Sequence, residues 1–172
     1  MGREIVCHKE VEMNLKIVPA YNLKKEIKSL FTEYTNLLIE GDSTFREYLE
    51  VQDYDKELAD LEVKYGQPEG RLYAAYWNEE LAGCVGLRKI DEQNCEMKRL
   101  YVKEEFRGKG IGDTLAKLVI AEAKKQGYSH MLLDTLPFLE TAIHMYRSYG
   151  FYEIECYNNC PMDNVIYMKL DL

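Results

Sequence analysis

The stretch Glu105-Phe106-Arg107-Gly108-Lys109-Gly110-Ile111-Gly112 decides the fold, because it joins a predicted strand to a predicted helix through three alternating glycines. Glycine tolerates positive φ and allows backbone N–H groups to approach a ligand closely. The N-terminus of the following helix adds a partial positive charge. The junction is therefore suited to an anion such as a pyrophosphate.

This loop differs from three familiar phosphate-binding patterns. The GxGxxG fingerprint needs a further glycine that does not follow Gly112, and the P-loop needs GK[ST] at the helix entrance. No obvious βαβ unit ends in an acidic residue at the distance typical of a dinucleotide site. A tight strand–helix turn without a ligand is the alternative, and three glycines beside Arg107 favour the binding site over it.

The segments around the loop predict helices first, then an antiparallel meander, then alternating strands and helices. Helical spacing of apolar residues runs over 22–41, resumes after 43–44, and recurs at 55–65, 111–127 and 135–150. Strands are predicted at 15–18, 71–77, 81–90, 95–103, 131–134, 151–157 and 165–170, with a hairpin turn at 78–80. The pattern predicts an α/β (α+β) fold, a mixed and largely antiparallel sheet with helices on both faces.

Length and composition predict one globular domain over residues 1–172. The chain is 47% hydrophobic and 30% charged, and no linker or repeat divides it. Lys and Arg number 22 against 30 Asp and Glu, a net charge of −8 that disfavours a nucleic-acid partner. The same charge mildly favours a cationic or amine-bearing ligand. No apolar run reaches the length of a membrane span, and the first residues lack the apolar region of a signal peptide, so we expect a cytoplasmic protein without a membrane partner.

The cysteines predict no metal site. Cys7, Cys84, Cys95, Cys156 and Cys160 are scattered, and with His8, His130 and His144 they give no zinc-ligand spacing. We interpret them as reduced thiols that partly fill the core, in preference to a redox pair of Cys156 and Cys160.

Two motifs carry a resemblance to a known family. Arg107-Gly108-Lys109-Gly110-Ile111-Gly112 is similar to the [Q/R]-x-x-G-x-[G/A] signature of the GNAT superfamily of N-acetyltransferases, and Tyr146-Arg147-Ser148-Tyr149-Gly150-Phe151 resembles its later Y-x-x-x-G-F. The resemblance covers roughly residues 70–157, the expected cofactor-binding core. Residues at about 20–66 fall where the superfamily varies and shapes its acceptor sites. Leu139 stands where an Asn often precedes the tyrosine.

The resemblance implies a three-layer α-β-α sandwich and an enzyme, an acyltransferase that takes acetyl-CoA as donor and needs no metal. Leu100, Tyr101 and Val102 would line the pantetheine arm. Arg107, Gly108, Lys109, Gly110, Ile111 and Gly112 would hold the pyrophosphate. Leu100 and Val102 could equally be ordinary hydrophobic core residues of the strand, and the two interpretations are compatible.

Amide formation from a thioester requires a base for the amine and an acid for the departing thiolate. The resemblance implies Tyr146 as the acid, whose alternative is a plain core aromatic. Glu96 is the candidate base, and a solvated or ion-paired carboxylate near Lys98 is the alternative. Strand alternation without a bulge places Glu96, Lys98, Leu100 and Val102 on one face. We interpret His144 as a surface residue.

The leading hypothesis is transfer of acetyl to a primary amine by direct attack in a ternary complex. The acceptor is a small molecule or a peptide amine, and a homodimer is possible. No Cys or Ser lies in a recognisable nucleophile setting, which disfavours a covalent acetyl-enzyme. The alternative is a non-catalytic acyl-CoA-binding or regulatory module.

Overall fold

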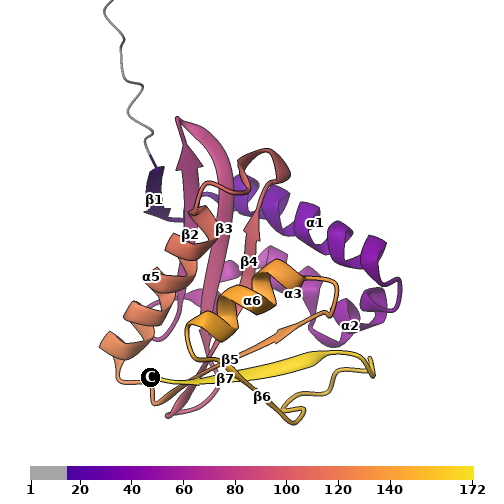
Figure 1. The fold of residues 1–172 in the computed structure, drawn as a ribbon. Helices are drawn as coiled ribbons and strands as arrows, with labels where there is room; N and C mark the ends of the chain where they lie inside the picture. Colours follow the sequence, from indigo (N-terminus) through magenta and orange to yellow (C-terminus); the bar gives the residue numbers. More distant parts are fainter. Residues whose placement is uncertain (1–14) are drawn as a thin grey trace, which may run out of the picture.

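Seven strands form one mixed sheet in the computed structural model, which describes residues 15–172 (Figure 1). They are β1 (Leu15–Pro19), β2 (Arg71–Trp77), β3 (Glu80–Lys89), β4 (Asn94–Val102), β5 (His130–Thr135), β6 (Tyr152–Ile154) and β7 (Ile166–Asp171). Their order across the sheet is β1-β2-β3-β4-β5-β7-β6. Neighbours pair antiparallel except β4 and β5, which pair parallel. The predicted mixed, largely antiparallel sheet is confirmed.

Helices cover both faces of the sheet and make the predicted three-layer sandwich (Figure 1). They are α1 (Lys24–Gly41), α2 (Phe45–Val51), α3 (Tyr54–Ala59), α4 (Leu61–Tyr65), α5 (Ile111–Gln126) and α6 (Glu140–Ser148), with a 3-10 turn at Glu104–Phe106. Apolar side chains of α1 and α4 form one core cluster against the sheet. Those of α5 and α6 form the larger cluster on the opposite face. Burial of these two apolar faces is what holds the layers together.

Two predicted helix boundaries are wrong. The helix expected at 55–65 is two short helices, because Asp60 is extended (φ −140°, ψ 93°) and its side chain accepts a 3.1 Å hydrogen bond from the Glu62 N–H. That bond caps the N-terminus of α4, and the extended backbone of Asp60 ends α3. The helix expected from Thr135 begins only at Glu140, since Thr135 still pairs with Ile166 of β7.

The hairpin between β2 and β3 forms as predicted. Asn78 and Glu79 both have positive φ, 49° and 70°. Positive φ at both central residues is the requirement of the type I′ turn that matches the twist of paired strands. Neither residue is glycine, so this turn carries some backbone strain.

A bulge at Arg99 overturns the predicted face of β4. Arg99 has a φ of 56°, and the pairing with β3 shifts at that point. The side chains before and after it therefore change sides. Leu100 and Val102 pack in the cluster beside α5, together with Met97. Lys98 instead lines cavities bounded by the helices of the other layer.

The parallel strands β4 and β5 separate where the site begins. Their pairing ends with Glu96 opposite Leu132, although β4 continues to Val102 and β5 to Thr135. Beyond Glu96 the two strands therefore leave a gap in the sheet. The side chains that border this gap line the cavities described below.

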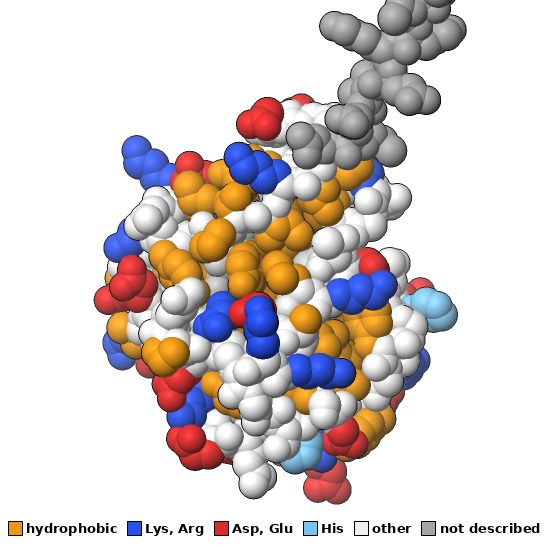
Figure 2. All heavy atoms as spheres, turned by 90° about the vertical axis from the view of Figure 1, so that its left-hand side faces the viewer, with side chains coloured by type: hydrophobic (Ala, Val, Ile, Leu, Met, Phe, Trp, Pro, Cys, Tyr) orange, Lys and Arg blue, Asp and Glu red, His pale blue; other side chains and the backbone are white. Residues whose placement is uncertain are grey.

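Acidic and basic side chains are interspersed on the face that carries β1 and α5, with apolar groups among them (Figure 2). Within residues 15–172, the structure has no helix long and apolar enough to cross a membrane. Cys7 and His8 lie outside the described residues, as does the start of the chain that we compared with a signal peptide.

Candidate active site

A groove of about 750 Å³ runs between the glycine loop, the end of β4 and the start of α6. It is lined by nearly all the residues predicted to hold a cofactor: Leu100, Tyr101, Val102, Arg107, Gly108, Gly110, Ile111 and Gly112. Lys109 is the exception, because its ammonium lies over the Trp77 ring, 5.4 Å from the centroid. The fold thus brings the strand and loop predicted from the sequence to one surface.

The glycine loop has the backbone geometry of an anion cradle. Gly108 and Gly110 have φ of 76° and 74°, and a Cβ added at either would meet no heavy atom within 4 Å. The first backbone bond of α5 runs from the Thr114 N–H to the Gly110 carbonyl, at 3.0 Å. The amides of the first turn before Thr114 therefore remain available to a ligand. Open space, bare backbone and a helix N-terminus fit a pyrophosphate.

Tyr146 lies where the groove meets a smaller inner cavity of about 40 Å³. Its ring is 7% exposed and packs 5.7 Å from the Phe151 ring. Within the described chain its hydroxyl makes no hydrogen bond. Burial raises the pKa of Tyr146 well above its usual range, and the nearby Tyr34 adds to this. The hydroxyl therefore stays protonated and can donate.

Three further residues border both the groove and the inner cavity. They are Tyr34 of α1, Leu100 of β4 and Leu139 before α6. Leu139 thus brings an apolar contact to the place where the resemblance leads one to expect an Asn. Burial raises the pKa of Tyr34 to about 12, so this second hydroxyl is also neutral.

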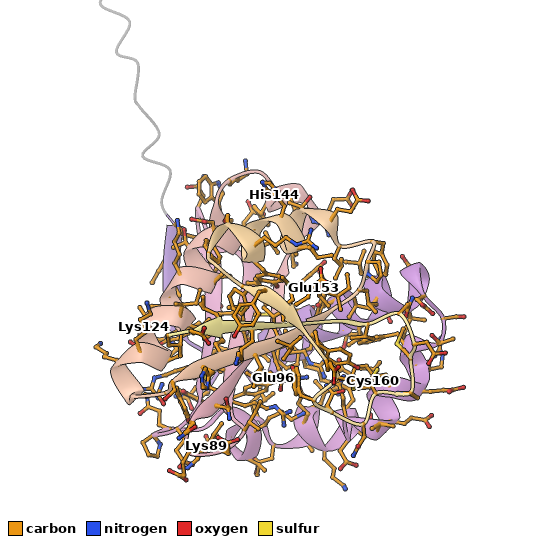
Figure 3. All side chains as sticks on the ribbon, turned by 60° about the horizontal axis from the view of Figure 1, so that its bottom comes forward. Lys89, Glu96, Lys124, His144, Glu153 and Cys160 are labelled. Carbon is orange, nitrogen blue, oxygen red and sulfur yellow. The ribbon has the colours of Figure 1, made fainter. Side chains whose placement is uncertain are left out.

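Glu96 lies at the point where β4 and β5 separate, in the interior of the molecule (Figure 3). Its side chain is fully buried. Oε1 accepts a 2.6 Å hydrogen bond from the Tyr157 hydroxyl, and Oε2 accepts one from Arg88 Nε. The Lys98 ammonium lies 3.8 Å from Oε2. Both oxygens therefore have donors, and Glu96 does not line the inner cavity.

Asp134 is the carboxylate that does line the inner cavity. Burial alone would raise its pKa, but the charge of Lys98 and hydrogen bonds from Tyr48 and Asn158 hold it below its usual range. The Asn158 bond to Oδ2 is 3.0 Å long. Asp134 is therefore ionised at neutral pH and stands at the wall of the space next to Tyr146.

Comparison with known proteins assigns the chain to a family. The acetyltransferase (GNAT) family model matches residues 30–151, most of the described chain. The protein belongs to the GNAT acetyltransferase family. It is 36% identical to an uncharacterised N-acetyltransferase of Dictyostelium discoideum, over 93% of this chain and 100% of that protein. It is 43% identical to another from Schizosaccharomyces pombe, over 72% of this chain and 77% of the relative. The protein is thus an acetyltransferase.

Solved GNAT structures share its fold. The PaiA N-acetyltransferase of Thermoplasma acidophilum, in complex with coenzyme A, superposes with a TM-score of 0.74 at 21% identity and covers 93% of this chain and 100% of its own. A GNAT acetyltransferase of Elizabethkingia anophelis with acetyl-CoA bound gives 0.52 at 29% identity, over 60% and 77%.

Beyond Leu100 and Tyr146, the GNAT motifs in the sequence did not indicate the residues of the inner cavity. Tyr34, Tyr48, Gln52 and Asp134 reach it from α1, α2 and β5, elements that carry no family motif here. Asp134 had one available signal, a carboxylate directly after the apolar run Met131-Leu132-Leu133. Whether Tyr48 and Gln52 line the cavity depends on how α2 packs, and the spacing of apolar residues does not specify that.

The remaining sequence candidates lie apart from the site. His144 is exposed on α6, as predicted (Figure 3). Cys84 and Cys95 are buried free thiols, while Cys156 and Cys160 are free and more accessible. Among residues 15–172, no group of three or more His, Cys, Asp and Glu is placed to hold a metal ion.

Proposed function

We propose that this GNAT acetyltransferase moves an acetyl group from acetyl-CoA to a primary amine by direct attack in a ternary complex. The observation that carries the proposal is the meeting of the long groove and the inner cavity at Tyr146. A donor in the groove and an acceptor in the cavity would place thioester and amine beside the same hydroxyl. Such positioning supplies much of the rate of a bimolecular reaction.

Acetyl-CoA fits the groove by its chemistry. The bare amides of the glycine loop and the side chain of Arg107 suit the pyrophosphate. The apolar side chains of Leu100 and Val102 and the ring of Tyr101 suit the pantetheine arm. The relatives with acetyl-CoA or coenzyme A bound support the same donor.

The reaction needs two proton transfers. An alkylammonium, with a pKa of about 10.4, must lose one proton before its nitrogen attacks the thioester carbonyl carbon. As the C–N bond forms and the C–S bond breaks, the sulfur takes the electron pair. Tyr146 gives the sulfur a proton and regains one from the acylated nitrogen. Of the two protons that the ammonium loses, one ends on sulfur and one in solvent.

Two carboxylates are candidates to take the first proton. Glu96, the base predicted from the sequence, is enclosed by Arg88 and Tyr157, so a proton would have to reach it through a water molecule. Asp134 lines the inner cavity and is the alternative that the geometry offers. Variants of the two residues distinguish these routes.

A direct attack is favoured over an acetylated cysteine. Burial raises the pKa of Cys95 to about 12 and that of Cys84 further, so neither thiol supplies a thiolate at neutral pH. Cys156 is exposed, and neither the groove nor the inner cavity includes it.

A panel of amines incubated with acetyl-CoA tests the proposal. We expect free thiol to appear only with an amine that becomes acetylated. Tight acetyl-CoA binding without thiol release from any amine class would instead indicate the non-catalytic acyl-CoA-binding or regulatory module. A cytoplasmic location, a homodimer, and the absence of nucleic-acid and membrane partners remain predictions from the sequence.

A further inference from the structure

Lys98 lines both the inner cavity and a second, outer cavity. The outer cavity has a volume of about 670 Å³ and lies beside α2, α3 and α4. It shares Tyr48, Gln52 and Lys98 with the inner cavity. The inner cavity in turn shares Tyr146 with the groove. The inner cavity therefore lies between the outer cavity and the groove proposed for the donor.

The Lys98 ammonium is buried without a close ion-pair or hydrogen-bond partner in the described chain. The residue is 7% exposed. Its ion pair with Glu96 Oε2 is long, at 3.8 Å, and it makes no hydrogen bond within the described chain. Lys64, by comparison, donates a 2.6 Å hydrogen bond to Glu57. An ammonium carries three N–H donors, and burying them without acceptors is costly. Lys98 therefore has donors to offer to a ligand.

The carboxylates near Lys98 are already bound by other groups. Glu96 accepts from Tyr157 and Arg88, and Asp134 accepts from Tyr48 and Asn158. A carboxylate oxygen that already accepts a hydrogen bond has fewer lone pairs left to accept one from Lys98. Asp134 accepts both bonds through Oδ2, and within the described chain the only carboxylate within 4 Å of the Lys98 ammonium is that of Glu96.

The four buried charges near the two cavities balance in number, but the ammonium of Lys98 lacks a close partner. The cations are Lys98 and Arg99, and the anions are Glu57 and Glu96. Arg99 and Lys64 are both bound to Glu57, and Arg88 is bound to Glu96. Both buried anions are thus held by closer cations, and the Lys98 ammonium is the buried charge left for a ligand.

We propose that Lys98 binds a carboxylate on the acceptor, and that the acceptor is an amine that carries a carboxylate, such as an amino acid. The inference rests on the proposed function and names its substrate class. The single charge of the Lys98 ammonium matches one carboxylate better than a phosphate, which carries nearly two charges. The narrow inner cavity also favours a small acceptor. Such an acceptor is a zwitterion, and its amine would lie toward Tyr146.

The test compares amino acids with their carboxamides, which keep the amine and lose the negative charge. The purified protein, acetyl-CoA and each acceptor are mixed, and thiol release gives kcat and KM. We expect wild-type kcat/KM to be about ten- to a hundredfold higher for the acids, the range of a charge-assisted hydrogen bond. Lys98→Met should remove this preference, because it lowers kcat/KM for the acids more than for the carboxamides.

Lys124→Met is the matched control, because Lys124 is exposed on α5 (Figure 3). It should keep the preference of the wild type. Equal wild-type rates on acids and carboxamides would overturn the role of Lys98 while leaving the proposed function intact. A preference for acids that survives in a folded Lys98→Met would do the same. No thiol release with any amine would instead refute the proposed function. The wild-type comparison needs no variant, so misfolding of Lys98→Met does not prevent the test.

Discussion

The Tyr157 hydroxyl donates a 2.6 Å hydrogen bond to Glu96 Oε1, and so ties the segment after β6 to the point where β4 and β5 part. The same carboxylate accepts from Arg88 through its other oxygen. A side chain held on both sides is well placed to fix the geometry of the strand gap. Its use as a base requires a water molecule between it and the amine.

The base is tested by Glu96→Gln and Asp134→Asn, compared in one assay. If Glu96 takes the proton, Glu96→Gln lowers kcat about a hundredfold or more at neutral pH. The rate should recover partly at high pH, where more free amine exists, and acetyl-CoA affinity should stay nearly unchanged. If kcat falls and recovers at high pH only in Asp134→Asn, then Asp134 is the residue that takes the proton. Loss of coenzyme A binding in Glu96→Gln would return Glu96 to a structural role.

Tyr146→Phe should lower turnover by up to about 10²–10⁴-fold, the usual contribution of a general acid. The ring stays in place against Phe151, so the free energy of unfolding and the affinity for acetyl-CoA should change little. Tyr149→Phe is the control, because its hydroxyl donates to Asp113 at 2.5 Å rather than facing the inner cavity. Near-normal turnover of Tyr146→Phe, with chemistry rate-limiting, would rule out the acid role.

Gly110→Asp should weaken coenzyme A binding by at least tenfold in calorimetry. The substitution puts a Cβ and a negative charge at the surface where the phosphates are expected, and it strains a φ of 74°. Gly127→Asp is the control for strain, since Gly127 has a φ of 85° at the other end of α5. It should lower stability by a similar amount and leave the affinity intact. Arg107→Ala should cost less affinity than Gly110→Asp, because the amides remain. Unchanged affinity in a folded Gly110→Asp would contradict the assignment of the loop.

Glu57→Gln should lower the free energy of unfolding by about 3 kcal/mol at pH 7, because it leaves the buried guanidinium of Arg99 without its anion. Burial alone would raise the pKa of Glu57, but Arg99 and Lys64 hold it well below its usual range. A lowered pKa stabilises the fold above about pH 4 and loses that effect as the pH falls. Urea unfolding should therefore show the gap between wild type and variant shrinking from pH 7 toward pH 3. The exposed Glu62→Gln should match wild type throughout, and a gap that stays constant with pH would contradict the account.

The fold could be predicted from the sequence because its signals are local. The spacing of apolar residues located α1, α5 and every strand, and Gly127 ends α5 as expected. The missed details depend on single residues that no periodicity reports. Asp60 breaks one predicted helix, and the positive φ of Arg99 reverses the faces of β4.

The candidate site could be predicted only where a motif carries it. The glycine loop, the end of β4 and Tyr146 fall in motifs, and the structure brings them to one groove. The acceptor side is built by contacts between distant segments. The sequence indicated Lys98 only as an ion-pair neighbour of Glu96, and its place in the lining of both cavities depends on the gap between β4 and β5 and on the packing of α2.

The most direct test of direct transfer uses acetyl-CoA with a labelled acetyl group and measures where the label goes. The protein is incubated with it first alone and then with a carboxylate-bearing amine, and free thiol, labelled amide and protein mass are measured together. The account predicts little thiol and no labelled protein before the amine is added, then equal amounts of thiol and N-acetylated product. Label that accumulates on the protein and is then passed to the amine would contradict it.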